Sequence, residues 1–287
     1  MSQNLQNSLS PHLQKLKYEM ELRGYSVQTQ RHYLCHLNLL EQYYKRPATD
    51  ILPDELKDYL HYRIKSGISH SYINISCSAF KLFFNKVLSL NWSGDVIVRP
   101  KRRKKLNQVL SQEEILSIFD HVSNFKNKTV LMTIYSSGLR ISEALNLKVS
   151  DIDSKNMLIR VSRGKGNKDR LTVLSSKNLE QLRRYWKLYR PTEFLFPGLF
   201  ADKPLAATNI QLAFRKAKNM AGISKPATVH TLRASFATHL LEAHTDLRTI
   251  QLLMGHSDVS MTANYIHLST AHIASVRSPL DRCDRRA

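Results

Sequence analysis

The chain contains 287 residues, 42% of them hydrophobic, enough for about two average domains with a core each. Lys and Arg number 43 against 23 Asp and Glu, so the formal net charge is +20 and nucleic acid is the first partner to expect. No apolar run approaches the ~18 residues that span a bilayer, and the N-terminal segment lacks a basic-then-apolar signal pattern, so we expect a cytoplasmic protein without a membrane partner.

Amphipathic spacing predicts a series of helices in the N-terminal third of the chain. The apolar faces repeat over residues 10–24, 33–44, 53–66 and 73–87. In the last of these, Phe80 and Phe84 lie on one stripe, and the helical period favours core packing over a base-stacking surface. We therefore expect residues 1–97 to form a small all-helical domain.

Residues 98–108 are expected to form a basic linker. The charged side chains around Pro100 are Arg99, Lys101, Arg102, Arg103, Lys104 and Lys105. Like charges this close repel one another, so the segment should be extended unless an anion neutralises it. It is either a solvated hinge or a strap across DNA phosphates, and the net charge of +20 favours the strap.

Residues 109–287 are expected to form a second, mainly helical domain. Ser111 and Glu114 have the spacing of a capping box before an amphipathic run, which predicts the start of its first helix. The next apolar helical run ends at Gly138. Further helical patterns cover residues 178–189 and continue from 207.

One β-hairpin interrupts these helices. Alternating, β-branched segments at residues 157–162 and 170–174 flank a charged, glycine-rich turn. The predicted fold class is therefore mainly α with a small antiparallel β-sheet, in two domains.

Four residues with possible chemistry occur as two spaced pairs. Arg140 precedes Glu143 by three positions, and His230 precedes Arg233 by three within HTLRASFATHLL, so a helix would bring each pair together. Taken singly, each pair has a structural explanation, as a surface ion pair or a polar helix face.

The C-terminal region adds two further candidates. An apolar helical face ends at Gly255, His256 follows the break, and a short capped helix would carry Tyr265. Alone, Tyr265 is best explained as a half-buried aromatic residue, so its significance depends on the other motifs.

The order and context of these motifs resemble the tyrosine recombinases, also called the phage integrase family. The similar blocks are SSGLRISEALNLKVSDID, GKGNKDR, HTLRASFATHLLEAHTDLRTIQLLMGH and TANYIHLS, which together span Ser136 to Ser269. The chain is most similar to compact bacterial Xer-type and transposon-borne integrases. The resemblance implies a SAM-like core-binding domain and a catalytic domain that form a C-shaped clamp on DNA, in the bacterial nucleoid.

The resemblance also implies a role for each candidate residue. Arg140 and Arg233 would contact the non-bridging oxygens of the scissile phosphate, with Glu143 bracing Arg140. Lys165, in preference to Lys168 of the same turn, would be the general acid toward the departing 5′ oxygen. His230 would be the acid/base partner of the nucleophile, His256 would donate a hydrogen bond to the phosphate, and Tyr265 would be the nucleophile.

We expect this chemistry to need neither a metal nor a cofactor. Arginines and a proton-accepting histidine can offset the cost of ionising a tyrosine, and no paired carboxylates accompany the motifs. The cysteines, Cys35, Cys77 and Cys283, lack the spacing of a metal site or of a disulfide framework.

Two alternatives to a site-specific recombinase remain open: a type IB topoisomerase, and a non-catalytic DNA-binding regulator derived from a recombinase. Many members of the family that the chain resembles carry histidine directly after the second arginine, where this chain has Ala234. The difference puts the fine tuning of the site in doubt more than catalysis itself. The expected partner is double-stranded DNA, bound by a homo-tetramer on two sites, with or without a related recombinase. A tail with Ile273, Val276 and Leu280 would contact a neighbouring subunit. The pattern does not distinguish mobile-element integration from chromosome-dimer resolution.

Overall fold

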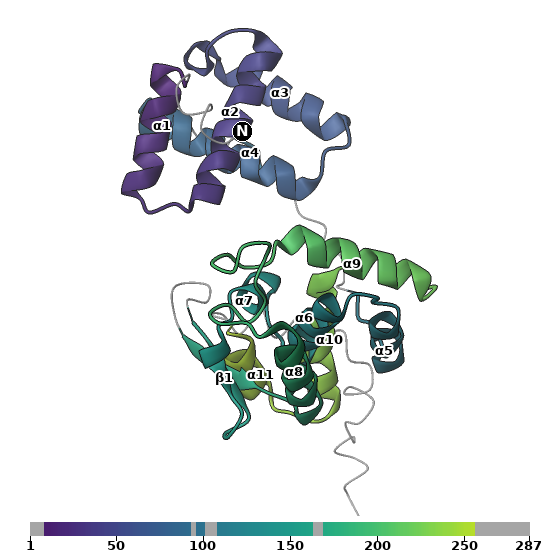
Figure 1. Ribbon diagram of the computed structural model, residues 1–287. Helices are drawn as coiled ribbons and strands as arrows, with labels where there is room; N and C mark the ends of the chain where they lie inside the picture. The colour runs from purple at the N-terminus through teal and green to yellow at the C-terminus, as the bar shows by residue number, and fades with distance from the viewer. Residues whose placement is uncertain (1–8, 93–95, 101–107, 163–168, 256–287) are drawn as a thin grey trace, which may run out of the picture. The chain divides into compact units, whose positions relative to one another are not determined.

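The structure is a computed structural model that describes residues 9–92, 96–100, 108–162 and 169–255. The chain divides into two compact units, with the boundary between Lys104 and Lys105 (Figure 1). In this described part of the chain, no helix is long and apolar enough to cross a membrane.

In its described residues, the first unit has helices and no strand. Its elements are α1 (Pro11–Leu22), α2 (Val27–Tyr44), the 3-10 turn η1 (Ala48–Asp50), α3 (Pro53–Lys65), α4 (His70–Leu82) and the π-helical turn η2 (Phe83–Val87). Ser26 and Ser69 cap α2 and α4 by accepting hydrogen bonds from backbone N–H groups of the first turn. Phe80 and Phe84 are fully buried, which confirms their interpretation as core residues.

The second unit is mainly helical around a small sheet. Its helices are α5 (Gln112–Asp120), α6 (Phe125–Ser137), α7 (Ile141–Leu145), the 3-10 turn η3 (Val149–Asp151), α8 (Ser176–Tyr189), α9 (Ala207–Met220), α10 (Val229–Glu242) and α11 (Leu247–Met254). Its strands, all antiparallel in the order β1-β2-β3, are β1 (Ile152–Asp153), β2 (Leu158–Val161) and β3 (Arg170–Val173). The predicted fold class is confirmed, although β1 was not expected because two residues are too short to show alternation.

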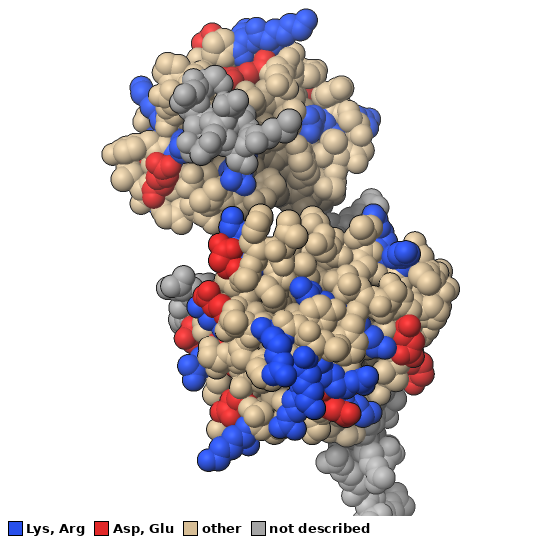
Figure 2. Space-filling model, viewed as in Figure 1, with Lys and Arg blue, Asp and Glu red and all other residues tan. Residues whose placement is uncertain are grey.

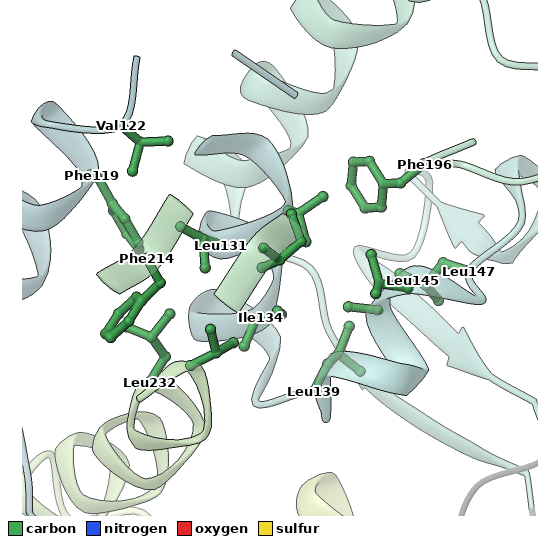
Figure 3. Packing of buried hydrophobic residues seen from close by; sticks show 14 of the residues in the cluster. Phe119, Val122, Leu131, Ile134, Leu139, Leu145, Leu147, Phe196, Phe214 and Leu232 are labelled. Carbon is green, nitrogen blue, oxygen red and sulfur yellow. The ribbon is translucent and has the colours of Figure 1, made fainter. Parts of the chain in front are cut away.

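Helix α6 is the centre of the second unit, and α5, α7, α8, α9, α10 and β3 all contact it. Because neighbours surround it, two of its threonines, Thr129 and Thr133, are buried. Their hydroxyls donate to the carbonyls one turn earlier, at Phe125 and Thr129. Figure 3 shows side chains from α5, α6, α7, α9, α10 and the segments that connect such elements in one apolar cluster. The labelled residues are Phe119, Val122, Leu131, Ile134, Leu139, Leu145, Leu147, Phe196, Phe214 and Leu232.

The end of α6 requires a glycine. Gly138 has φ +62°, and a Cβ there would lie 2.4 Å from the Phe236 ring of α10. Leu139 then donates back to the Ile134 carbonyl at 3.1 Å and is fully buried. This turn brings Arg140 to the N-terminus of α7, and the predicted stop at Gly138 is confirmed.

Candidate active site

The candidate site is organised around one carboxylate. Glu143 of α7 accepts hydrogen bonds from the backbone N–H of Arg140 at Oε2 and from its Nη1 at Oε1, both at 2.7 Å. Arg140 and Glu143, three residues apart, therefore contact each other at the start of α7, as expected from the sequence. The Glu143 side chain is 7% exposed, so these contacts are shielded from solvent.

A second arginine reaches the same carboxylate from the sheet. Arg170, the first residue of β3, donates through Nη1 to Oε1 of Glu143 at 2.9 Å and through Nη2 to Oε2 at 2.8 Å. Its Nε donates to the Leu253 carbonyl at 2.9 Å. Paired, parallel bonds of this kind are the strongest geometry for an arginine and a carboxylate. Arg170 therefore connects α7 to the last turn of α11.

The third arginine comes from α10. Arg233 donates through Nη1 to the Gly138 carbonyl at 2.6 Å and through Nη2 to the Met254 carbonyl at 2.5 Å, and Nη1 lies 3.6 Å from Oε2 of Glu143. It is 1% exposed. The structure thus places Arg140 and Arg233, predicted from separate motifs, at one carboxylate.

The protonation state of Glu143 follows from these contacts. Desolvation raises the pKa of its carboxyl group, but hydrogen bonds from Arg170 and Arg140 outweigh it and hold the pKa at about 2. Glu143 is therefore ionised at neutral pH and is a structural anion, consistent with its expected role as a brace.

His230 lies near the start of α10, and its side chain is exposed although Arg233, one turn later, is buried. Desolvation by neighbouring protein atoms lowers the pKa of His230 from 6.5, and the positive charges of Arg233 and Arg140 lower it further. The neutral form, which can accept a proton, is therefore favoured at neutral pH.

Three predicted site residues, Lys165, His256 and Tyr265, lie outside the described residues, as does the C-terminal tail. The same holds for the linker positions Lys101, Arg102, Arg103, Lys104 and Lys105. Arg99 is described, and its Nη2 donates to the Ser78 hydroxyl of α4 at 3.1 Å.

The sequence reasoning missed Arg170. It closes the GKGNKDR block, but its partners lie 27 and 83 positions away, so no local spacing marks it. The available signal was an arginine at the start of a predicted strand. At the position that departs from many relatives, Ala234 is buried in the small apolar cluster with Phe236 and Met254.

Basic side chains also gather on the surface of the second unit. Figure 2 shows a group of Lys and Arg over α8. The exposed cations of this helix and its C-cap are Lys177, Arg183, Arg184, Lys187 and Arg190. The positive charge of the chain is therefore not confined to the linker.

Family models match both units. The phage integrase family model covers residues 108–272, and the model of the phage integrase N-terminal SAM-like domain covers residues 13–94. The chain belongs to the phage integrase family of tyrosine recombinases. It is a site-specific recombinase, an enzyme that cleaves and rejoins DNA strands by transesterification.

Individual relatives agree with this assignment. The chain is 39% identical over 282 residues to the putative integrase/recombinase y4qK of Sinorhizobium fredii, covering 97% of this chain and 91% of that protein. It is 32% identical over 268 residues to the tyrosine recombinase XerA of Pyrococcus horikoshii, covering 91% and 90%. A crystal structure of a lambda integrase tetramer bound to a Holliday junction shares the fold, with TM-score 0.73, 19% identity and coverage of 91% and 78%.

Proposed function

We propose that this recombinase cleaves duplex DNA by attack of Tyr265 on a scissile phosphate and retains the product as a 3′-phosphotyrosyl intermediate. The observation that supports it is the shielded cluster in which Glu143 holds Arg140 and Arg233, whose charges also act on His230. Guanidinium groups stay charged and donate in pairs, so they suit the charge that grows on a phosphate during attack. By analogy with oxyanion-hole donors, each would contribute ~3 kcal/mol.

The two arginines differ in access to DNA. The Arg140 side chain is 21% exposed, so it can meet a phosphate oxygen directly. Arg233 is 1% exposed and acts from the interior, where charge interactions are less screened. A direct contact from Arg233, as the resemblance implies, requires its guanidinium to become accessible when DNA binds.

The remaining steps follow from the proposed nucleophile. A free tyrosine has a pKa near 10, so ionising it at neutral pH costs about 4 kcal/mol, which neutral His230 offsets by accepting the proton. Tyr265 forms a bond to phosphorus while the bond to the 5′ oxygen breaks, and Lys165 protonates that oxygen. His256 donates a hydrogen bond to the phosphate. A 5′ hydroxyl of another strand then displaces Tyr265, so rejoining needs no ATP.

The proposed partner is double-stranded DNA, held by four copies of the chain on two sites, with or without a related recombinase. Lambda integrase, which shares the fold, forms a tetramer on a Holliday junction. Deleting everything after Ser275 should then impair assembly of the tetramer on DNA more than binding of the first subunit. Equal loss of both, in a mobility-shift titration, would count against a role of the tail in assembly.

The decisive experiment uses a nicked suicide substrate made from the DNA that flanks the gene. Loss of the short 5′-hydroxyl strand prevents rejoining, so a covalent adduct should accumulate on the wild-type protein and map to Tyr265 by mass spectrometry. Tyr265→Phe should bind the same DNA and form no adduct. Unchanged cleavage by this variant would refute the assigned nucleophile.

The same preparation separates the alternatives. Adduct formation together with relaxation of supercoiled plasmid that lacks the site would favour a topoisomerase. Site-specific binding without any adduct would favour a non-catalytic regulator. The expected result is adduct formation on the flanking DNA and strand exchange between two such sites.

A further inference from the structure

We infer that Arg170 is a positioning residue for DNA cleavage: it satisfies Glu143 so that Arg140 keeps donors for the phosphate, and it fixes the end of α11. The inference rests on the proposed function. Arg170 does not meet the phosphate itself, because its Nη1 and Nη2 donate to Glu143 and its Nε donates to the Leu253 carbonyl.

The first part of the argument is the hydrogen-bond capacity of Glu143. An ionised carboxylate offers about four acceptor positions. Arg170 occupies two of them with Nη1 and Nη2, and Arg140 occupies two with its backbone N–H and Nη1. Without Arg170, the shielded carboxylate would draw further donors from Arg140 and Arg233. Those are the guanidiniums that the proposed mechanism directs at DNA.

The second part concerns α11. Arg170 and Arg233 donate to the consecutive carbonyls of Leu253 and Met254, which are left without helical partners at the C-terminal end of α11. These cations also complement the negative end of the helix dipole. Gly255 then ends the helix with φ +61°, and a Cβ there would lie 2.7 Å from Cδ of Arg170. Arg170 therefore sets where the backbone leaves α11, one residue before His256.

The test compares Arg170→Gln and Arg170→Lys with the wild type in single-turnover cleavage at saturating enzyme. We expect about a 100-fold slower cleavage for Arg170→Gln, the scale of a misplacement of about 1 Å in an active site. Arg170→Lys should lose less, because one ammonium can reach Glu143 but cannot make the paired bonds. The salt dependence of DNA binding should not change, since Arg170 neutralises no phosphate.

A neutral substrate distinguishes positioning from a merely structural role. With a methylphosphonate in place of the scissile phosphate, less charge requires stabilisation, so the losses caused by Arg170→Gln and Arg140→Gln should both become smaller. An equal loss on both substrates would overturn the inference, as would wild-type cleavage by a folded Arg170→Gln protein. The control is Lys148→Gln, which removes an exposed ion pair with Glu193 in the same unit.

Gly255→Ala provides a second approach if Arg170→Gln does not fold. This variant keeps Arg170, but the added Cβ would displace the Arg170 side chain. Its loss of cleavage rate should therefore also be smaller on the methylphosphonate substrate. Its matched control is Gly222→Ala, a position with φ +70° and nothing within 4 Å. If wild type forms an adduct at Tyr265 while Gly255→Ala behaves as Gly222→Ala does, the inference fails and the proposed function stands. If wild type forms no adduct, both fail.

Discussion

Replacing Glu143 with glutamine should destabilise the second unit substantially at neutral pH. The folded protein holds the pKa of this carboxyl at about 2, against an ordinary value of 4.5. At 1.4 kcal/mol per unit, the ionised form contributes about 3 kcal/mol to folding. Because Glu143 is 7% exposed, solvent screening reduces this figure little. Glutamine keeps the shape but loses the charge and one acceptor.

The dependence on pH makes the prediction specific. A depressed pKa stabilises the fold fully above the unfolded value of 4.5, and that stability disappears as the pH falls toward 2. The difference between wild type and Glu143→Gln should therefore shrink to roughly half by about pH 3. Urea unfolding followed by Trp186 fluorescence measures it, in a Trp92→Phe background so that emission reports the second unit alone.

Two outcomes would refute this reasoning. One is a Glu143→Gln protein as stable as wild type at neutral pH. The other is a stability difference that stays constant between neutral pH and about pH 3, since the loss would then not come from the charge. Glu193→Gln is the control: its side chain is 53% exposed and pairs with Lys148, so it should cost less than about 1 kcal/mol.

Three further expectations follow. The acid limb of the cleavage rate against pH should lie below 6.5, because the pKa of His230 is lowered. Arg140→Gln should move this limb to higher pH, because it removes one of the positive charges that lower the pKa of His230. A limb that does not move would argue against His230 as the base. Gly138→Ala should cost at least about 2 kcal/mol in thermal or urea unfolding, against about 1 for Gly222→Ala, since only the former meets a ring; equal costs would contradict the packing argument. If residues 101–105 form a strap on DNA, each Lys→Gln change there should lower the salt slope of binding by about 0.9, whereas an unchanged slope would indicate a solvated hinge.

Local signals in the sequence predicted much of the fold. The capping box of Ser111 and Glu114 is present. Oγ of Ser111 accepts a hydrogen bond from the backbone N–H of Glu114, and Oε2 of Glu114 accepts one from the backbone N–H of Ser111. Helices end at Gly138 and Gly255, both in the left-handed conformation. These features depend on residues within one turn of each other, so the spacing along the chain carries the information.

The environment of the site could not be predicted in the same way. The spacing places Arg233 on one helix face with His230, yet Arg233 is buried. The carbonyls of Gly138 and Met254, 95 and 21 positions away, accept its hydrogen bonds. The sequence pattern places Arg170 in a strand and in the GKGNKDR block without indicating its contact with Glu143. Contacts between distant segments depend on how α6, α10, α11 and β3 pack, and no spacing in the chain records that.

The charges around Glu143 do not balance. One carboxylate meets the guanidiniums of Arg140, Arg170 and Arg233, so positive charge is in excess among these four side chains. Excess charge away from water costs free energy, and a second acidic residue would reduce that cost. The same residue would compete with phosphate for Arg140 and weaken the preorganised field that the proposed chemistry requires. Stability and the proposed function therefore place opposite demands on the one carboxylate that the three arginines share among the described residues.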